Sequence, residues 1–350
     1  MAPDIRDIEV IAPNLKRRLS GVTATVVRLV PLQARRIGIA ATGPGLPPHV
    51  PHVPLWRLFL MPRDRLRVWH ARRNTEMALG LVLRGVFRRR LALLFTSASQ
   101  RRHTGYTRGL IARMDGLVAT SGRSACYLER TAEVIHHGID TEAFSPPLDR
   151  AALRRRLGLP EGDVILGCFG RIRAQKGTDA FVDAAIDLLQ VRPGVTALVM
   201  GRATEGHEAF LDDLKARAAA AQLADRVRFL SEVPVHEMAD WYRALDLYVA
   251  PQRWEGFGLT PIEAMACGVP VVATRVGAFE EIVTKATGTL VPPGDVPALA
   301  AAIAPFLDDA DRRRTAGAAA LERVRTQFRI EDEAAALVAV YRRLLAGERW

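Results

Sequence analysis

Two glutamates with a glycine-rich turn between them are the residues with the clearest chemical potential in this sequence. Glu255 and Glu263 enclose the letters GFGLTPI, in which Thr260 suits a helix N-cap and Pro261 suits the first position of a helix. Because the first turn of a helix presents unpaired backbone N–H groups, it favours an anion such as a diphosphate. Two carboxylates beside that anion can hold the hydroxyl groups of a sugar and a ribose. The alternative is an ordinary helix–strand junction with a capping carboxylate. We predict a ligand-binding loop made of Gly256, Phe257, Gly258, Leu259 and Thr260.

A second run with chemical potential, GCFGRIRAQKG, occupies residues 167–177 between a predicted strand and a predicted helix. The guanidinium of Arg171 can bind two phosphate oxygens at once, and Lys176 adds a point charge. Taken alone, either residue could equally be a solvated surface cation. The glycine spacing is not that of the dinucleotide-binding fingerprint, and no acidic residue supports NAD. We predict that Arg171 and Lys176 can bind phosphate oxygens, and cations of this kind can replace a metal ion in stabilising a phosphate leaving group.

A weaker glycine signal lies near the N-terminus, where the letters SGVT follow the first predicted strand. Gly21 in this run permits a close approach of the backbone to a ligand. A plain turn between a strand and a helix explains the same letters equally well.

The elements that must position these residues follow from the hydrophobic pattern. Short apolar runs alternate with helical patterns along the chain, which indicates βα repeats and parallel sheets. A length of 350 residues suggests two domains. We predict an α/β protein with Rossmann-like domains at residues 1–150 and 151–330, and a linker at residues 145–160. The predicted strands are 9–12, 36–41, 67–69, 91–96, 116–120 and 132–136 in the first domain, and 164–169, 196–200, 226–230, 247–250, 269–274 and 288–291 in the second.

The segment from Glu255 to Glu263 resembles the E-x7-E signature of glycosyltransferase family 4. Three further runs resemble the same family, namely HGID at 137–140, VGAFEEI at 276–282 and GTLVPPGD at 288–295. The resemblance implies the GT-B fold, in which two Rossmann-like domains face each other across a cleft. It also implies that the last helix, within residues 331–350, packs back on the first domain.

The family resemblance assigns roles to the motif residues. It implies that Glu255 lies at the donor sugar and Glu263 at the nucleotide ribose. Arg171 and Lys176 resemble the family's pair of cations at the donor diphosphate, and Gly21 resembles its glycine loop in the first domain. No residue stands out as a covalent nucleophile, so the implied reaction retains the anomeric configuration by attack on the face from which the diphosphate leaves.

Three runs resemble the lipopolysaccharide core mannosyltransferases of rhizobia: APNLKRRLSGVT at 12–23, WHARRN at 69–74 and QRWEGF at 252–257. This resemblance implies GDP-mannose as the donor and a Kdo-bearing lipid A as the acceptor. The alternatives are another donor such as UDP-glucose or UDP-galactose, or an epimerase or phosphorylase on the same fold. Only four lysines are present to carry the pyridoxal cofactor that a phosphorylase needs.

The charge of the chain is uneven. The formal net charge is +11, and residues 1–150 hold 24 Lys and Arg against 11 Asp and Glu. Such a surplus attracts an anionic partner, although abundant solvated arginine is the alternative. Aromatic residues make up 6% of the chain and do not cluster with the arginines, which disfavours nucleic acid. The candidate contacts for an anionic glycolipid acceptor are Arg17, Arg18, Arg72, Arg73, Arg101 and Arg102.

The sequence departs from the family at one place. Many relatives have a histidine just after the strand predicted here at residues 91–95, whereas this chain continues TSASQRRH. His103 or His70 could enter the site from nearby, but a structural or acceptor-binding role fits each of them as well. The identity of any catalytic histidine stays open.

The remaining features indicate a cytoplasmic protein without a metal. Three well-separated cysteines, Cys126, Cys168 and Cys267, are expected to be buried and inert. The charged N-terminus is unlike a signal peptide, and no apolar run approaches the ~20 residues of a membrane span. The letters DAD at 309–311 indicate a helix cap, and the adjacent His136 and His137 point apart on a strand. We therefore expect at most a peripheral contact with the inner membrane.

Overall fold

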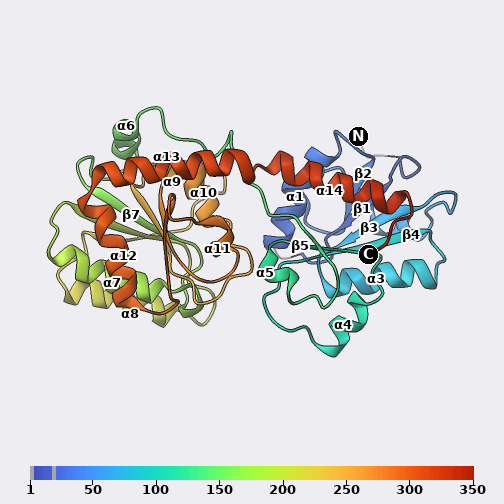
Figure 1. Ribbon diagram of the computed structural model, residues 1–350, viewed down its shortest axis with the longest axis horizontal. Coiled ribbons are helices and arrows are strands. Elements are labelled where there is room, and N and C mark those ends of the chain that lie inside the picture. Colours follow the sequence, from blue (N-terminus) through green and yellow to red (C-terminus); the bar gives the residue numbers. More distant parts are fainter. Residues whose placement is uncertain (1–3, 18–20) are drawn as a thin grey trace. The chain divides into compact units, whose positions relative to one another are not determined.

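The computed structural model describes residues 4–17 and 21–350, which form two compact units. The first unit comprises residues up to 137 together with 330–350, and the second comprises residues 138–329. Each unit contains a sheet of six parallel strands with helices on its faces (Figure 1), which confirms the predicted α/β class.

The sheet of the first unit has the strand order β2-β1-β3-β4-β5-β6. Successive side chains of a strand point to opposite faces, so each strand contributes to two cores. Val68 and Leu94 pack with α1 and α14 on one face, while Trp69 and Leu93 pack with α2 and α3 on the other. The elements are β1 Val10–Pro13, α1 Gly21–Gln33, β2 Ile39–Thr42, α2 Leu55–Leu58, β3 Arg67–Ala71, α3 Asn74–Gly85, β4 Leu91–Ser97, α4 Gly105–Ile111, β5 Gly116–Ala119, α5 Gly122–Ala125, β6 Glu133–Val134 and α14 Ile330–Leu345.

The sheet of the second unit has the order β12-β11-β10-β7-β8-β9. Leu166 and Val249 pack with α7 and α12 on one face, while Tyr248 and Val271 pack with α10 and α13 on the other. The elements are α6 Arg150–Arg156, β7 Val164–Phe169, the 3₁₀ helix η1 Ala174–Lys176, α7 Thr178–Gln190, β8 Val195–Met200, α8 Glu208–Ala220, β9 Val227–Leu230, α9 Met238–Arg243, β10 Leu247–Ala250, α10 Thr260–Ala266, β11 Val271–Thr274, α11 Phe279–Ile282, β12 Gly288–Val291, α12 Val296–Asp308 and α13 Ala310–Gln327.

The division between the units falls at residue 137, not at the predicted residue 150. Ile139 donates its N–H to the carbonyl of Phe328 at 2.8 Å, and Arg243 donates to the carbonyls of Ala143 and Ser145. These contacts tie residues 138–149, part of which we took for a linker, to the second unit.

Helix α14 belongs to the first unit. Its buried residues recur at the spacing of one helix face and pack on α1 and the sheet (Figure 1). Tyr341 on this face forms hydrogen bonds with His70 and Gln33. Trp350 donates its indole N–H to the carbonyl of Leu117 at 3.1 Å, so this residue contacts β5.

Two local predictions need correction. Strand β6 ends at Val134, so His136 and His137 do not lie on a strand, and His137 instead pairs with Glu333. Cys126 is exposed, because α5 ends at Ala125 and the turn that follows lies on the surface. Cys168 and Cys267 are buried as predicted.

The predicted cap at residues 309–311 is present. The Asp309 side chain accepts from the backbone N–H of Arg312 at the start of α13. In the part of the chain that the structure describes, no three His, Cys, Asp or Glu side chains gather as a metal site. Over the same residues, no helix has the length and hydropathy needed to cross a bilayer.

Candidate functional site

The two motifs of the second unit meet where β7 and β10 end. Gly177 adopts a φ of +69°, and a Cβ at this position would lie 1.9 Å from the carbonyl oxygen of Pro251. Only glycine therefore lets the two loops approach so closely. Arg253 joins them further, because its N–H donates to the carbonyl of Gln175 at 3.0 Å and its guanidinium pairs with Asp179 at 2.6 Å.

This close approach brings Lys176 and Glu255 into contact. The Lys176 ammonium donates to Oε2 of Glu255, and Oε1 of Glu255 accepts from the backbone N–H of Gly256 at 3.0 Å. The two side chains are 23% and 17% exposed, so water reaches the pair. The predicted cation and the predicted carboxylate are thus neighbours, although 79 positions separate them in the sequence.

Arg171 lies two residues after the end of β7 and shares a small pocket with Lys176. Gln252 and Thr178 also line this pocket. Arg171 is exposed, and no ion pair of Arg171 occurs among the residues that the structure describes. Gln252 is only 4% exposed, and its buried Oε1 has no hydrogen-bond partner within the described ranges. In the sequence analysis Gln252 was only the first residue of the run QRWEGF and was not a candidate site residue, because its burial and orientation depend on the fold.

The loop that leads into α10 requires glycine at position 258. Gly258 has a φ of +90°, and a Cβ there would lie 2.3 Å from the ring of Phe279. Helix α10 begins at Thr260, one residue earlier than predicted, so Leu259 takes the N-cap position that was predicted for Thr260. Phe257 is 4% exposed and packs in the core, so only its backbone can face a ligand.

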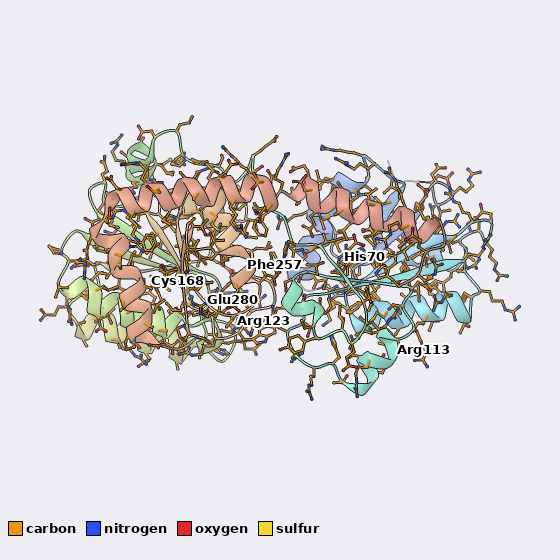
Figure 2. The ribbon with its side chains drawn as sticks, viewed as in Figure 1. His70, Arg113, Arg123, Cys168, Phe257 and Glu280 are labelled. Carbon is orange, nitrogen blue, oxygen red and sulfur yellow. The ribbon has the colours of Figure 1, made fainter. Side chains whose placement is uncertain are left out.

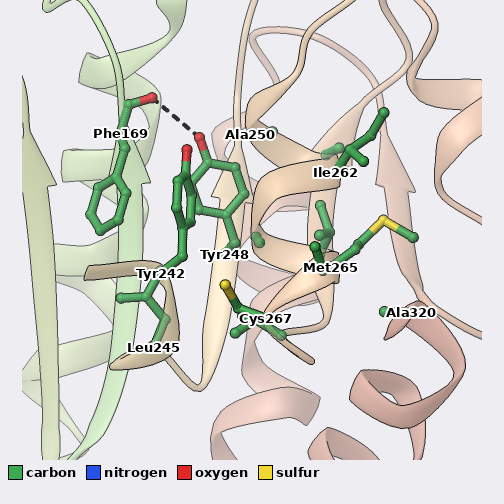
Figure 3. Packing of buried hydrophobic residues seen from close by; sticks show 14 of the residues in the cluster. Phe169, Tyr242, Leu245, Tyr248, Ala250, Ile262, Met265, Cys267 and Ala320 are labelled. Carbon is green, nitrogen blue, oxygen red and sulfur yellow. Dashed lines mark hydrogen bonds between the residues drawn. The ribbon is translucent and has the colours of Figure 1, made fainter. Parts of the chain in front are cut away.

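Glu263 is held by a tyrosine that the sequence analysis missed. The buried Tyr242 on α9 donates its hydroxyl to Oε2 of Glu263 at 2.8 Å. Burial, reinforced by the Glu263 carboxylate, raises the pKa of Tyr242 well above its usual value, so the hydroxyl stays a donor at neutral pH. The Tyr242 ring packs with Phe169 and Tyr248 (Figure 3), and Tyr248 donates to the carbonyl of Phe169 at 3.2 Å.

In the first unit, Gly21 begins α1, and its neighbour Ser20 lies outside the described residues. A Cβ at Gly21 would meet no atom within 4 Å, so the surrounding described chain does not itself require glycine. The buried Asn14, which follows β1, accepts from the hydroxyl of Thr23 on α1 at 3.0 Å. A ligand approach at Gly21 stays a prediction.

The six candidate arginines of the first unit separate into groups. Arg73 is only 11% exposed and pairs with the buried Glu76 at 2.7 Å, so we withdraw it as an acceptor contact. Arg17 is exposed, and Arg18 lies outside the described residues. Arg72, Arg101 and Arg102 line one pocket at the carboxyl ends of β3 and β4.

The two candidate histidines differ in environment. His70 (labelled in Figure 2) is fully buried and forms hydrogen bonds with Tyr341 at 2.7 Å and with Thr96 at 2.6 Å. Burial, together with the nearby Arg72, lowers the pKa of His70 well below its usual value, so this histidine is a neutral link between β3, β4 and α14. His103 lines the pocket with the arginines, and burial lowers its pKa as well.

Comparison with known proteins identifies the class. The family described as "Glycosyl transferases group 1" matches residues 149–323, which contain both motifs of the second unit. The chain belongs to this family and is a glycosyltransferase.

Two relatives match almost the whole chain. The lipopolysaccharide core biosynthesis mannosyltransferase LpsB of Rhizobium meliloti (strain 1021) is 54% identical over 98% of this chain and 99% of its own length. The mannosyltransferase LpcC of Rhizobium leguminosarum bv. viciae is 53% identical over 99% of both.

Solved structures show the same fold. Anabaena Alr3699/HepE in complex with UDP superimposes with a TM-score of 0.83 at 19% identity, over 95% of this chain and 99% of its own. The C-terminal domain of LpcC from Francisella tularensis has a TM-score of 0.52 at 34% identity, over 55% of this chain and all of its own.

Proposed function

We propose that this protein transfers mannose from GDP-mannose to the Kdo-containing inner core of lipopolysaccharide, with retention of the anomeric configuration. The observation that carries the proposal is the contact of Lys176 with Glu255 beside Arg171. Two relatives with more than half of their residues identical to this chain are named lipopolysaccharide core mannosyltransferases.

The donor lies on the second unit in this proposal. Arg171, Lys176 and the backbone amides of residues 258–260 bind the diphosphate and stabilise the charge that develops as it leaves. Metal ions are not needed for this step, because fixed cations supply the same electrostatic stabilisation. Glu263, oriented by Tyr242, holds the ribose hydroxyls.

Glu255 orients the mannose in this proposal. Its carboxylate already accepts from Lys176 and from the Gly256 N–H, so it is positioned to accept further hydrogen bonds from sugar hydroxyls. The acceptor hydroxyl attacks the anomeric carbon on the face from which the diphosphate departs. Its proton passes to the leaving diphosphate oxygen on that same face, so no covalent intermediate with the protein forms.

The acceptor is an anionic glycolipid that lies in a membrane, so we place the enzyme at the cytoplasmic face of the inner membrane. The surplus of basic residues in positions 1–150 supports a partner of this charge. No nucleic acid takes part in this proposal.

A donor panel tests the proposal. Pure protein is offered GDP-mannose, UDP-glucose, UDP-galactose and ADP-glucose, each with Kdo-containing lipid A, and a hexose mass increment is sought on the acceptor. Product with GDP-mannose alone supports the proposal. Product with a different donor contradicts the mannosyl assignment, and sugar-nucleotide isomerisation without an acceptor product indicates an epimerase.

A further inference from the structure

A pocket of about 500 Å³ opens at the carboxyl ends of β3 and β4 in the first unit. This volume is within the range of small-molecule sites. Arg72 follows β3 directly, and residues 98–104 after β4 form the other side of the pocket. Open parallel sheets bind their ligands at this edge.

The pocket carries positive charge from three arginines. Arg72, Arg101 and Arg102 line it, and the described residues of the lining include no carboxylate. No ion pair of these three arginines occurs among the described residues. Other arginines of the same unit do pair with carboxylates, namely Arg67 with Asp64, Arg73 with Glu76, and Arg84 with Asp115. Within the described chain no carboxylate balances the charge of the pocket arginines, which favours an anionic ligand in the pocket.

The rest of the lining consists mainly of small polar groups. Asn74, Ser97, Ser99 and Thr104 contribute amide and hydroxyl groups, which suit the hydroxyl groups of a sugar. Asn74 donates to Thr107 at 2.8 Å, which fixes this wall. The buried Nε2 of His103 has no hydrogen-bond partner within residues 4–17 and 21–350.

We propose that this pocket binds a sugar acid, with its carboxylate on Arg101 and Arg102 and its hydroxyl groups on the polar wall. Arg72 is the third cation, and its guanidinium is held in place by the carbonyl of His70 at 3.3 Å. Planar guanidinium groups match the two oxygens of a carboxylate. The inference rests on the proposed function, because it identifies the sugar acid as the Kdo residue of the acceptor.

Binding without transfer tests the pocket directly. Ligand-observed NMR measures the methyl glycoside of Kdo, its carboxyl methyl ester, and a methyl glucoside 6-phosphate, with no donor present. We expect the free carboxylate to bind and the ester to lose most of the signal. Equal binding of the ester, or binding of the phosphate sugar alone, overturns the assignment of a sugar carboxylate.

Kinetics with variants give the second readout. Arg101→Gln and Arg102→Gln remove charge from exposed side chains, so we expect both to fold. Each is expected to raise the KM for the acceptor about tenfold to 100-fold, as loss of a hydrogen bond to a charged group does, and to leave the KM for GDP-mannose unchanged. The matched control is Arg113→Gln, because Arg113 (labelled in Figure 2) follows α4 outside the pocket lining, and its guanidinium donates to the carbonyl of Gly109 at 2.6 Å.

The outcomes separate the two proposals. Binding of the sugar acid without transfer from GDP-mannose contradicts the proposed function and supports the pocket. If the protein transfers mannose and neither variant changes the KM for the acceptor, the proposed function is supported and the assignment of the pocket to a sugar acid is overturned. A rise in the KM for GDP-mannose in both variants places the pocket on the donor and also overturns the inference.

Discussion

Replacement of Lys176 by methionine tests the donor site most sharply. The substitution removes the ammonium that donates to Glu255 and, under the proposed function, contacts the diphosphate. A hydrogen bond to a charged group contributes about 1.5–3 kcal/mol, and every 1.4 kcal/mol is tenfold, so we expect kcat/KM to fall on the order of 10²-fold. Because water reaches Glu255, the carboxylate left alone is still solvated, and we expect Tm to change little.

The assay is the initial rate of mannosyl transfer, measured for Lys176→Met, Glu255→Gln and the double variant. If Lys176 contacts the diphosphate in addition to its contact with Glu255, then Lys176→Met lowers kcat/KM even in protein that already carries Glu255→Gln. No further loss in that background means that Lys176 only positions Glu255. The control is Lys215→Met, which removes an exposed lysine from α8. Wild-type rates in both single variants would refute the site.

Three further predictions follow from the second unit. Tyr242→Phe removes the hydrogen bond to Glu263, which contributes about 1.5–3 kcal/mol, so we expect the KM for GDP-mannose to rise about tenfold or more in steady-state kinetics while kcat changes little. Gly258→Ala forces a Cβ into a position that is already filled and a φ that disfavours it, so we expect Tm to fall in thermal melts, and an unchanged Tm contradicts this reading. Burial raises the pKa of Cys168 to about 12, so iodoacetamide at pH 8 is expected to modify the exposed Cys126 and spare Cys168 in mass spectra. With a raised folded pKa, the contribution of Cys168 to stability is complete below its usual pKa of 9.0 and is lost as pH rises towards 12, which denaturant titrations at pH 8 and 10 can check.

Local patterns indicated where the motifs lie relative to strands and helices, because these settings depend on short-range chemistry. The strand and helix periods placed Arg171 and Lys176 between a strand and a helix, and parallel strands bring such loops to one edge of the sheet. The contact of Lys176 with Glu255 is consistent with that reasoning. Gly258 is likewise visible in the sequence, because a turn of this geometry needs glycine.

Features that depend on tertiary packing could not be predicted in the same way. Tyr242 reads as an ordinary core residue, and only the fold brings its hydroxyl to Glu263, 21 positions away. The end of the first unit at residue 137 depends on contacts with Phe328 and Arg243, which are remote in the sequence. Arg73 could not be distinguished in the sequence from the other candidate arginines, yet its pairing with the buried Glu76 leaves it only 11% exposed.

One NMR experiment tests the central claim most directly. The protein is incubated with Kdo-containing lipid A and GDP-mannose labelled with ¹³C at the anomeric carbon, and the labelled signal is followed. We predict that the signal leaves the nucleotide and appears on the acceptor as an α-mannoside, the configuration of the donor. A β-mannoside contradicts retention, and label found only in free mannose or in an isomerised nucleotide contradicts mannosyl transfer to the core.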